Sequence, residues 1–294
     1  MKKEYKNNTA KLGMIFSLTV FGTIGLFVRY IDMPSGFISL VRGIIGALFL
    51  FGVSVLKKEK VGFSLPKKQI ILLILSGICM GTNWILLFEA YRYTTVAKAT
   101  LYYYFAPVIV IITSPVLFKE KLTVRKIICV LTATAGMVAV SDITGSVFNK
   151  SEIPGLLFGL GAAVLYACVV IFNKKLSDIS AYEKTTLQLL FASLAALPYV
   201  ILSTDFNKIS FSAVQILLLV VVGVFHTGFA YTIYFGSINR IKAQSAAIMS
   251  YIDPIVSVLL SAFVLKEKTS LISIIGAAVV LISTFISELP EKEK

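Results

Sequence analysis

Charged side chains are scarce in this chain. Only 15% of its 294 residues are Asp, Glu, Lys or Arg, whereas 57% are hydrophobic. A water-soluble protein of this size would have too little polar surface to cover so much apolar material. Together with a mean hydropathy of +0.88, this shortage excludes a single soluble globule and indicates that the lipid bilayer is the main solvent of the protein.

Histidine and cysteine are also rare, which excludes several kinds of chemistry. The chain has one histidine, His226, so it has no H-E-x-x-H zinc motif, and it lacks the G-x-S-x-G and G-x-x-x-x-G-K-[ST] motifs. Its three cysteines, Cys79, Cys129 and Cys168, lie in apolar stretches without the spacing of a metal site or a disulfide framework. We therefore expect no enzyme, no ATP-driven step, no metal and no cofactor, and we interpret the cysteines as buried small apolar residues.

Long apolar stretches make up most of the sequence. A transmembrane helix needs about 20 mostly apolar residues, and charged, proline and glycine breaks divide the chain into ten such stretches with short connections. The sequence therefore predicts an all-α polytopic membrane protein with ten transmembrane helices. The expected spans are 12–30, 35–56, 69–91, 95–117, 124–141, 154–174, 183–203, 212–236, 243–264 and 270–288.

The basic residues are divided unequally between the two sets of loops. The chain carries 28 Lys and Arg against 15 Asp and Glu, a formal net charge of +13. With the N-terminus inside, 20 basic residues fall on the cytoplasmic side and seven on the outer side, and Arg42 lies within the second span. By the positive-inside rule, both termini of this multi-pass cell-membrane protein are expected in the cytoplasm. The basic excess then reports topology and does not support nucleic-acid binding.

The second half of the chain repeats the first. A shift of 147 residues aligns positions 88–128 with 235–275 without a gap and gives ten identities. Apolar composition alone does not produce matched Tyr-x-x-Pro and Lys-Glu-Lys motifs. These motifs contain Tyr104 and Tyr251, Pro107 and Pro254, and the segments Lys119-Glu120-Lys121 and Lys266-Glu267-Lys268.

We expect two domains of five helices each, residues 1–147 and 148–294. Because five is an odd number, the second half enters the membrane from the opposite side, and the halves are inverted repeats. This architecture is typical of transporters that work by alternating access. The paired Lys-Glu-Lys segments are expected to cap helix ends and to anchor them at opposite membrane faces.

These features together resemble the EamA family of the drug/metabolite transporter superfamily. The resemblance rests on ten spans, a proline in the fourth and ninth, Arg42 in the second, and a Glu-containing turn after each proline-bearing span. The two turns read Lys119-Glu120-Lys121-Leu122-Thr123 and Lys266-Glu267-Lys268-Thr269, with Lys-Glu-Lys where many members have Gly-Glu-Arg/Lys. The resemblance covers essentially the whole chain.

Membership of this family would imply a particular arrangement of the ten helices. Spans one to four and six to nine would line a central cavity, while spans five and ten would pack outside and offer a surface for a homodimer. The family also implies export or exchange of small metabolites. It does not name the substrate.

Two prolines interrupt the spans at matched places. Pro107 and Pro254 lack a backbone N–H, so the carbonyls of Tyr103 and Ser250, four residues earlier, lose their helical partners. Free carbonyls near mid-membrane can coordinate a cationic group, and both prolines are expected to act as hinges. The alternative is that they only kink helices whose neighbours satisfy the carbonyls.

Asp253 is the most informative single residue. It lies about ten residues into the ninth span, roughly 15 Å deep at 1.5 Å per residue, where an acid costs about 2.5 to 3.5 kcal/mol. Its counterpart in the first repeat is Ala106, so the repeat does not require an acid there. We expect Asp253 to bind a cationic group or a proton, and the alternative is a protonated or capped structural acid.

Three other polar residues in the spans each have two interpretations. Arg42 could bind a substrate carboxylate or form a packing or gating ion pair. Glu89 and Arg92 are three residues apart on one helical face, so they are expected to pair near the outer surface, although Glu89 could instead form a gate with Arg42. His226, near the middle of the eighth span, suits proton coupling because imidazole titrates near neutral pH, or it is held by a backbone carbonyl.

Aromatic residues are frequent in the stretches expected to face the cavity. Tyr and Trp offer a ring face to organic cations and a polar tip for hydrogen bonds, although Tyr231 and Tyr234 also fit an interfacial belt. Asn83 and Gln188 could add hydrogen bonds or hold helices together. The expected binding set is Asn83, Trp84, Tyr103, Tyr104, Gln188 and Tyr251, with Arg42, His226 and Asp253.

The sequence as a whole favours a secondary transporter. It would move a small amine-bearing or zwitterionic solute, such as an amino acid or a drug-like cation, outward by alternating access, with proton coupling or exchange. Its partners would be that solute and the lipid bilayer. The alternatives are a non-transporting membrane scaffold or sensor, a channel, and an intramembrane enzyme of unrecognised type.

Overall fold

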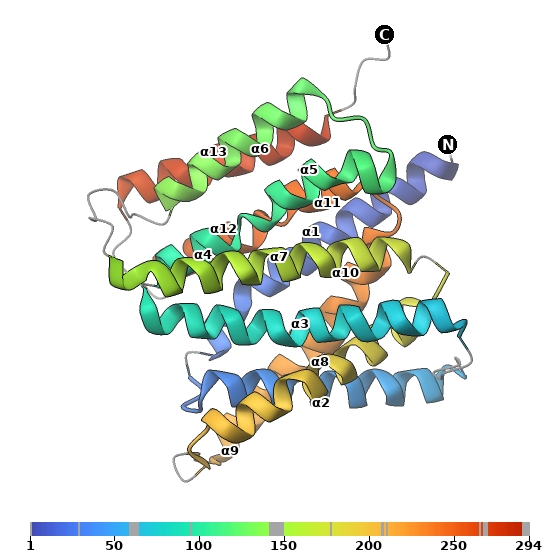
Figure 1. Ribbon diagram of the computed structural model, residues 1–294, viewed down its shortest axis with the longest axis vertical. Helices are drawn as coiled ribbons and strands as arrows, with labels where there is room; N and C mark the ends of the chain where they lie inside the picture. Colours follow the sequence, from blue (N-terminus) through green and yellow to red (C-terminus); the bar gives the residue numbers. More distant parts are fainter. Residues whose placement is uncertain are drawn as a thin grey trace.

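A computed structural model of the protein describes residues 2–28, 30–58, 65–94, 96–140, 150–176, 178–206, 209, 211–264, 266 and 270–289. Within these ranges every regular element is a helix, and the long helices lie roughly alongside one another (Figure 1). The elements are α1 (Lys2–Val28), α2 (Ser35–Leu56), α3 (Lys67–Tyr93), α4 (Val96–Tyr103), α5 (Ala106–Phe118), α6 (Val124–Val140), η1 (Lys150–Glu152), α7 (Ile153–Lys175), α8 (Ala181–Ser203), α9 (Ala213–Val221), the π-helical η3 (Val222–Phe229), α10 (Ala230–Ile238), α11 (Ala243–Met249), α12 (Ile252–Phe263) and α13 (Leu271–Glu288).

Eight stretches of helix in the described part are long and apolar enough to cross a membrane. They match eight of the ten expected spans, and their outward apolar side chains, such as Val116 at 84% exposure, suit contact with lipid. The fifth expected span is α6, a helix of 17 residues. The ninth is not one helix, because a turn at Ser250 and Tyr251 divides it into α11 and α12.

The two repeats share unusual backbone features at matched positions. The fourth span is broken at Tyr104 and Phe105, between α4 and α5, where the ninth is broken between α11 and α12. Lys119 and Lys266 both have left-handed backbones, with φ of 55° and 53°. This conformation is uncommon for residues other than glycine, so the two lysines share an unusual backbone at matched positions after the broken spans.

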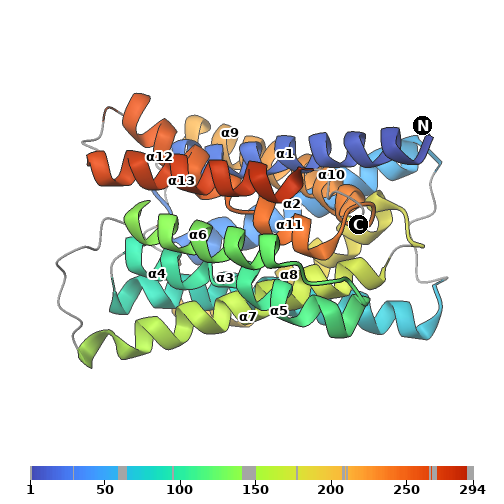
Figure 2. The same ribbon diagram turned by 90° about the horizontal axis from the view of Figure 1, so that it is seen from above.

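The packing of the helices follows the symmetry of two inverted repeats. The contact of α1 with α10 corresponds to that of α7 with α3, and the contact of α2 with η3 corresponds to that of α8 with α3. Two contacts correspond to themselves: α2 with α8, and α6 with α13. Spans five and ten, α6 and α13, form a pair at one edge of the bundle, as expected (Figures 1 and 2).

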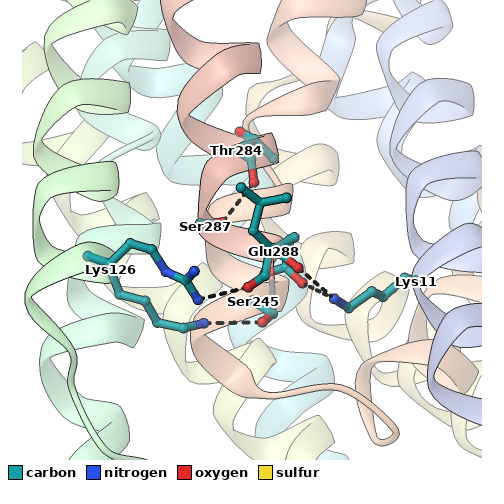
Figure 3. A network of polar contacts seen from close by, with 8 residues as sticks. Lys11, Lys126, Ser245, Thr284, Ser287 and Glu288 are labelled. Carbon is teal, nitrogen blue, oxygen red and sulfur yellow. Dashed lines mark hydrogen bonds and ion pairs between the residues drawn. The ribbon is translucent and has the colours of Figure 1, made fainter. Parts of the chain in front are cut away.

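Polar contacts tie this outer pair to the rest of the bundle at one end (Figure 3). Lys11 Nζ in α1 lies 2.6 Å from Glu288 Oε2 in α13. On the other side, Lys126 Nζ in α6 donates to Ser245 Oγ in α11 at 3.2 Å. The beginning of α1 and the end of α13 therefore lie at the same end of the molecule, as an even number of spans requires.

Some sequence predictions fall on residues that the structure does not describe. The domain boundary expected at residues 147–148 lies outside the described residues, as do Glu267, Lys268 and Thr269 of the second Lys-Glu-Lys turn.

Helices α6 and α13 meet at two glycines, Gly136 and Gly276. A Cβ atom on Gly276 would lie 2.7 Å from the carbonyl oxygen of Gly136 and 2.8 Å from the amide nitrogen of Val140. Backbone atoms cannot rotate away, so Gly276→Ala should push α13 from α6 and lower the free energy of unfolding by about 1–3 kcal/mol. The measurement is the thermal unfolding of purified protein in detergent. Gly52→Ala is the control, because a Cβ there meets nothing within 4 Å; equal effects of the two variants would contradict the packing described.

Candidate functional site

Asp253 and Tyr104 join the two repeats where both broken spans are interrupted. Asp253 lies in the first turn of α12, and Tyr104 lies in the turn between α4 and α5. The hydroxyl of Tyr104 donates to Asp253 Oδ2 at 2.9 Å, and the tyrosine is 8% exposed. The acid thus has one neutral partner, and no basic side chain in the described part of the chain forms an ion pair with it.

Pro107 and Pro254 start helices in this structure. Pro107 lies in the first turn of α5, and Pro254 lies in the first turn of α12. A proline is tolerated at such a position because the amide hydrogen it lacks would have no partner there. Each proline therefore follows a break in its span. The alternative predicted from the sequence was only a kink in a continuous helix.

A crevice lies beside the break in the fourth span. Its walls come from α5, α7, α10 and α11, and they include Pro107, Tyr166, Tyr234 and Ser250. The crevice has no room for a water molecule.

Tyrosines from both repeats form one cluster around this crevice. The Tyr103 ring lies 5.2 Å from that of Tyr104 and 5.5 Å from that of Tyr166. The hydroxyl groups of Tyr166 and Tyr234 are 2.9 Å apart, which continues the cluster into α10. Tyr251, with its ring 6.3 Å from that of Tyr104, is fully buried. These distances suit aromatic pairs.

Three residues in the tyrosine cluster and its surroundings were not predicted from the sequence. Phe21 of α1 lies 4.7 Å from the Tyr231 ring and 5.8 Å from the Tyr234 ring. Thr134 of α6 shares a hydrogen bond of 3.2 Å with the hydroxyl of Tyr251. Tyr199 of α8 bonds Glu89, as described below. Each is an ordinary residue of an apolar span, and no local signal distinguishes it.

Arg42 stacks on Trp84 rather than pairing with an acid. The guanidinium carbon lies 4.7 Å from the Trp84 ring centroid, a cation–π distance. Arg42 Nε is buried without a hydrogen-bond partner, and no carboxylate of the described residues forms an ion pair with this arginine. Tyr103 and Tyr231 each lie within electrostatic reach of both Arg42 and Asp253.

Glu89 forms a local network at the C-terminal end of α3. It pairs with Arg92 at 3.1 Å, as the three-residue spacing predicts, and accepts a hydrogen bond of 2.6 Å from the Tyr199 hydroxyl. The alternative gate between Glu89 and Arg42 is not formed in this conformation.

His226 lies in the π-helical segment η3, beside the first span. Its Nε2 is 3.0 Å from Thr23 Oγ1, its ring lies 4.7 Å from that of Phe27, and its buried Nδ1 has no hydrogen-bond partner. π-helical turns inside α-helices are frequent at functional sites. His226 thus has a threonine partner, and a proton-coupling role stays a prediction.

Asn83 and Gln188 form hydrogen bonds between helices. Asn83 Nδ2 donates to the carbonyl of Ala162 at 2.6 Å, which joins α3 to α7. Gln188 Nε2 donates to Ser76 Oγ at 2.7 Å, which joins α8 to α3. Both side chains therefore hold helices together, which was the alternative predicted from the sequence.

Charged side chains hold the turn between α10 and α11 at the end of the molecule shown in Figure 3. Glu120, from the first Lys-Glu-Lys segment, accepts hydrogen bonds from the amides of Ala243 (2.7 Å) and Gln244 (3.2 Å) at the start of α11. The fully buried Lys184 donates to the carbonyl of Phe235 at 3.0 Å, near the end of α10. An anion at a helix start and a cation at a helix end both complement the helix dipole. Glu120 is thus a helix cap, as expected, but for a helix of the other repeat.

Removing the negative charge of this cap should weaken the contact between the repeats. In Glu120→Gln, an amide replaces a carboxylate that accepts two backbone hydrogen bonds, so the free energy of unfolding should fall by about 1–2 kcal/mol. Thermal unfolding in detergent measures the change. Lys121→Gln, which alters the charge of an exposed neighbour, serves as the control. An unchanged melting temperature for Glu120→Gln would show that the cap contributes nothing to stability.

Several proteins resemble this chain over most of its length. An "Uncharacterized transporter YxxF" of Bacillus subtilis (strain 168) is 24% identical over 277 residues, covering 94% of this chain and 88% of the relative. "Solute carrier family 35 member G1" of Mus musculus is 28% identical over 178 residues, covering 57% and 48%. A protein of known crystal structure superposes with a TM-score of 0.83 at 19% identity, covering 95% of this chain and 97% of that one. This last likeness concerns the fold.

The family model described as "EamA-like transporter family" matches residues 8–142 and again residues 153–289. The two matches cover most of the chain and correspond to the two repeats seen in the helix packing. The protein is a multi-pass membrane transporter and not an enzyme, and it belongs to the EamA-like transporter family of the drug/metabolite transporter superfamily.

Proposed function

We propose that this transporter moves a small zwitterionic or amine-bearing solute, such as an amino acid or a drug-like cation, outward across the cytoplasmic membrane by alternating access. The hydrogen bond between Asp253 and Tyr104 carries the proposal. It places a carboxylate without an ion-pair partner among tyrosines, between two broken helices from opposite repeats. A partly buried charge of this kind inside a membrane span is costly unless a ligand or a proton compensates it.

A second charge of opposite sign supports a zwitterion rather than a simple cation. Arg42 stacks on Trp84, and the buried Nε of its guanidinium lacks a hydrogen-bond partner. Tyr103 and Tyr231 lie within electrostatic reach of both Arg42 and Asp253. A solute with an amine at one end and a carboxylate at the other would satisfy both charges, with tyrosine rings between them.

Alternating access is supported by the geometry of the broken spans. The breaks lie at matched positions in the two repeats, next to Pro107 and Pro254, so each half can tilt where its helix already has an end. The crevice beside them is closed to water. We propose that the prolines are the hinges that open it, and that Asp253 or His226 carries a coupled proton unless the transport is an exchange.

The proposal includes an orientation and an assembly. Both termini would face the cytoplasm, because this orientation places most basic residues inside. The repeats would divide at residues 147 and 148. The exposed apolar faces of α6 and α13, which include Leu131 and Ile282, would be the contact surface if the protein forms a homodimer.

Asp253→Asn and Tyr104→Phe test the acid directly. A thermal-shift screen of purified protein against amino acids, amines, purines and antibiotics identifies a stabilising ligand. Asp253→Asn should then weaken binding and counterflow of that ligand in proteoliposomes about tenfold to hundredfold, since a hydrogen bond to a charged group contributes about 1.5–3 kcal/mol. Tyr104→Phe should have a smaller effect in the same direction. Asp32→Asn, at an exposed loop position, is the control, and full counterflow by Asp253→Asn would remove the role proposed for the acid.

Arg42→Gln tests whether the solute carries a carboxylate. The variant should bind an amino-acid ligand at least about tenfold more weakly, because a charge-assisted contact is lost, while binding of the decarboxylated amine should be unchanged. Isothermal titration with both ligands gives the comparison. Equal losses for the two ligands would mean that Arg42 supports the site without contacting a carboxylate.

A further inference from the structure

The hydrogen bonds between α3 and α7 define how these two helices face each other. Asn83 in α3 donates to Ala162 in α7 at 2.6 Å, and Asn173 in α7 donates to Ser76 in α3 at 3.4 Å. The residue numbers rise along one helix as they fall along the other, so the helices are antiparallel. Residues of α3 between these two bonds therefore lie at the same level along the bundle as the segment of α7 between them.

Cys79 and Cys168 both lie within this interval, one on each helix. Cys79 follows Ser76 by three residues, and Cys168 precedes Asn173 by five, so each is near the same crossing level. The two thiols lie next to each other, and both residues are partly buried. The spacing of the cysteines in the sequence gave no sign that these two lie together, and their partial burial corrects the expectation that they are buried small apolar residues.

The contact between α3 and α7 near the two thiols faces the hydrocarbon of the bilayer. Leu75 and Ile78 of α3 are 42% and 44% exposed, and Val164 of α7 is 48% exposed. These side chains lie in the middle of membrane-spanning helices, so lipid covers them. Water-soluble thiols and thiol oxidants are therefore kept away from the pair, whereas lipid-soluble compounds can approach it.

We propose that Cys79 and Cys168 form a disulfide bond that joins the first repeat to the second, with a lipid-soluble quinone as the oxidant. Two S–H bonds break and one S–S bond forms. The two thiols together lose two protons and two electrons, which convert the quinone to its quinol. The product closes a loop from residue 79 to residue 168 and leaves Cys129, on α6, as a thiol.

This bond would act on stability rather than on transport. A disulfide stabilises mainly by restricting the unfolded chain, and the effect grows with the length of the closed loop. The two helices already lie against each other along their length, through the hydrogen bonds above and through Gly161, which approaches the Leu86 side chain. The oxidised protein should therefore keep its fold and resist heat better than the reduced protein.

The experiment compares reduced and oxidised protein in lipid nanodiscs. Wild-type protein is treated with decylubiquinone, and in parallel with copper–phenanthroline in air, and is then analysed by intact mass and by peptide mapping without reductant. We expect a loss of two hydrogens per chain, a peptide pair linked through Cys79 and Cys168, and a melting temperature raised by about 5 °C or more. Dithiothreitol added after solubilisation should reverse all three changes.

Single serine variants make the test specific. Cys79→Ser and Cys168→Ser should give no internal link and no rise in melting temperature, while Cys129→Ser should behave like the wild type. A link that survives in Cys79→Ser, or no link in wild type with either oxidant, would overturn the proposed pair. A link made by copper–phenanthroline alone would overturn the quinone as oxidant. None of these readouts depends on a transported solute.

Discussion

Helix ends inside a hydrocarbon layer are the constraint on which this architecture depends. No water is available there, so every backbone amide and carbonyl at a helix end needs a partner from the protein. Broken helices carry this energetic cost, but they also bring polar groups into the interior of the bundle. The same requirement is met at the end of the bundle, in the turn between α10 and α11, where Glu120 satisfies two amides at the start of α11 and Lys184 satisfies a carbonyl at the end of α10. Glu120 belongs to the first repeat and α11 to the second, so this cap is also a contact between the repeats, whereas Lys184 and α10 both belong to the second repeat.

The repeats share a scaffold but differ in chemistry. The broken spans and the left-handed lysines occur in both halves, whereas Asp253 has an alanine, Ala106, as its counterpart. These symmetric features form the scaffold of both repeats. The asymmetric acid, and the arginine held on Trp84, give the interior a polarity that the repeat alone would not have.

Much of the fold could be predicted from the sequence, because membrane spans are visible as long apolar stretches and the repeat is visible as matched motifs. Asp253 was also identifiable, since an acid inside an apolar span is expensive. Its hydrogen bond with Tyr104 was not, because periodicity does not say which face of one helix meets a helix 149 residues away. The same limit hid the contact between Cys79 and Cys168. Phe21 was missed because a phenylalanine in an apolar span carries no sign of its neighbours.

The π-helical segment η3 has a consequence for the aromatic cluster. A π-helical turn holds one residue more than an α-helical turn, so it rotates everything after it around the helix axis by about 100°. Tyr231 and Tyr234 follow η3 directly and face Phe21 and Tyr166 only with this extra residue in place. Shortening η3 by one residue would turn both phenols toward another side of the bundle while preserving a helix of ordinary appearance. The inward direction of these rings is thus encoded by the length of η3, as well as by the identity of the rings themselves.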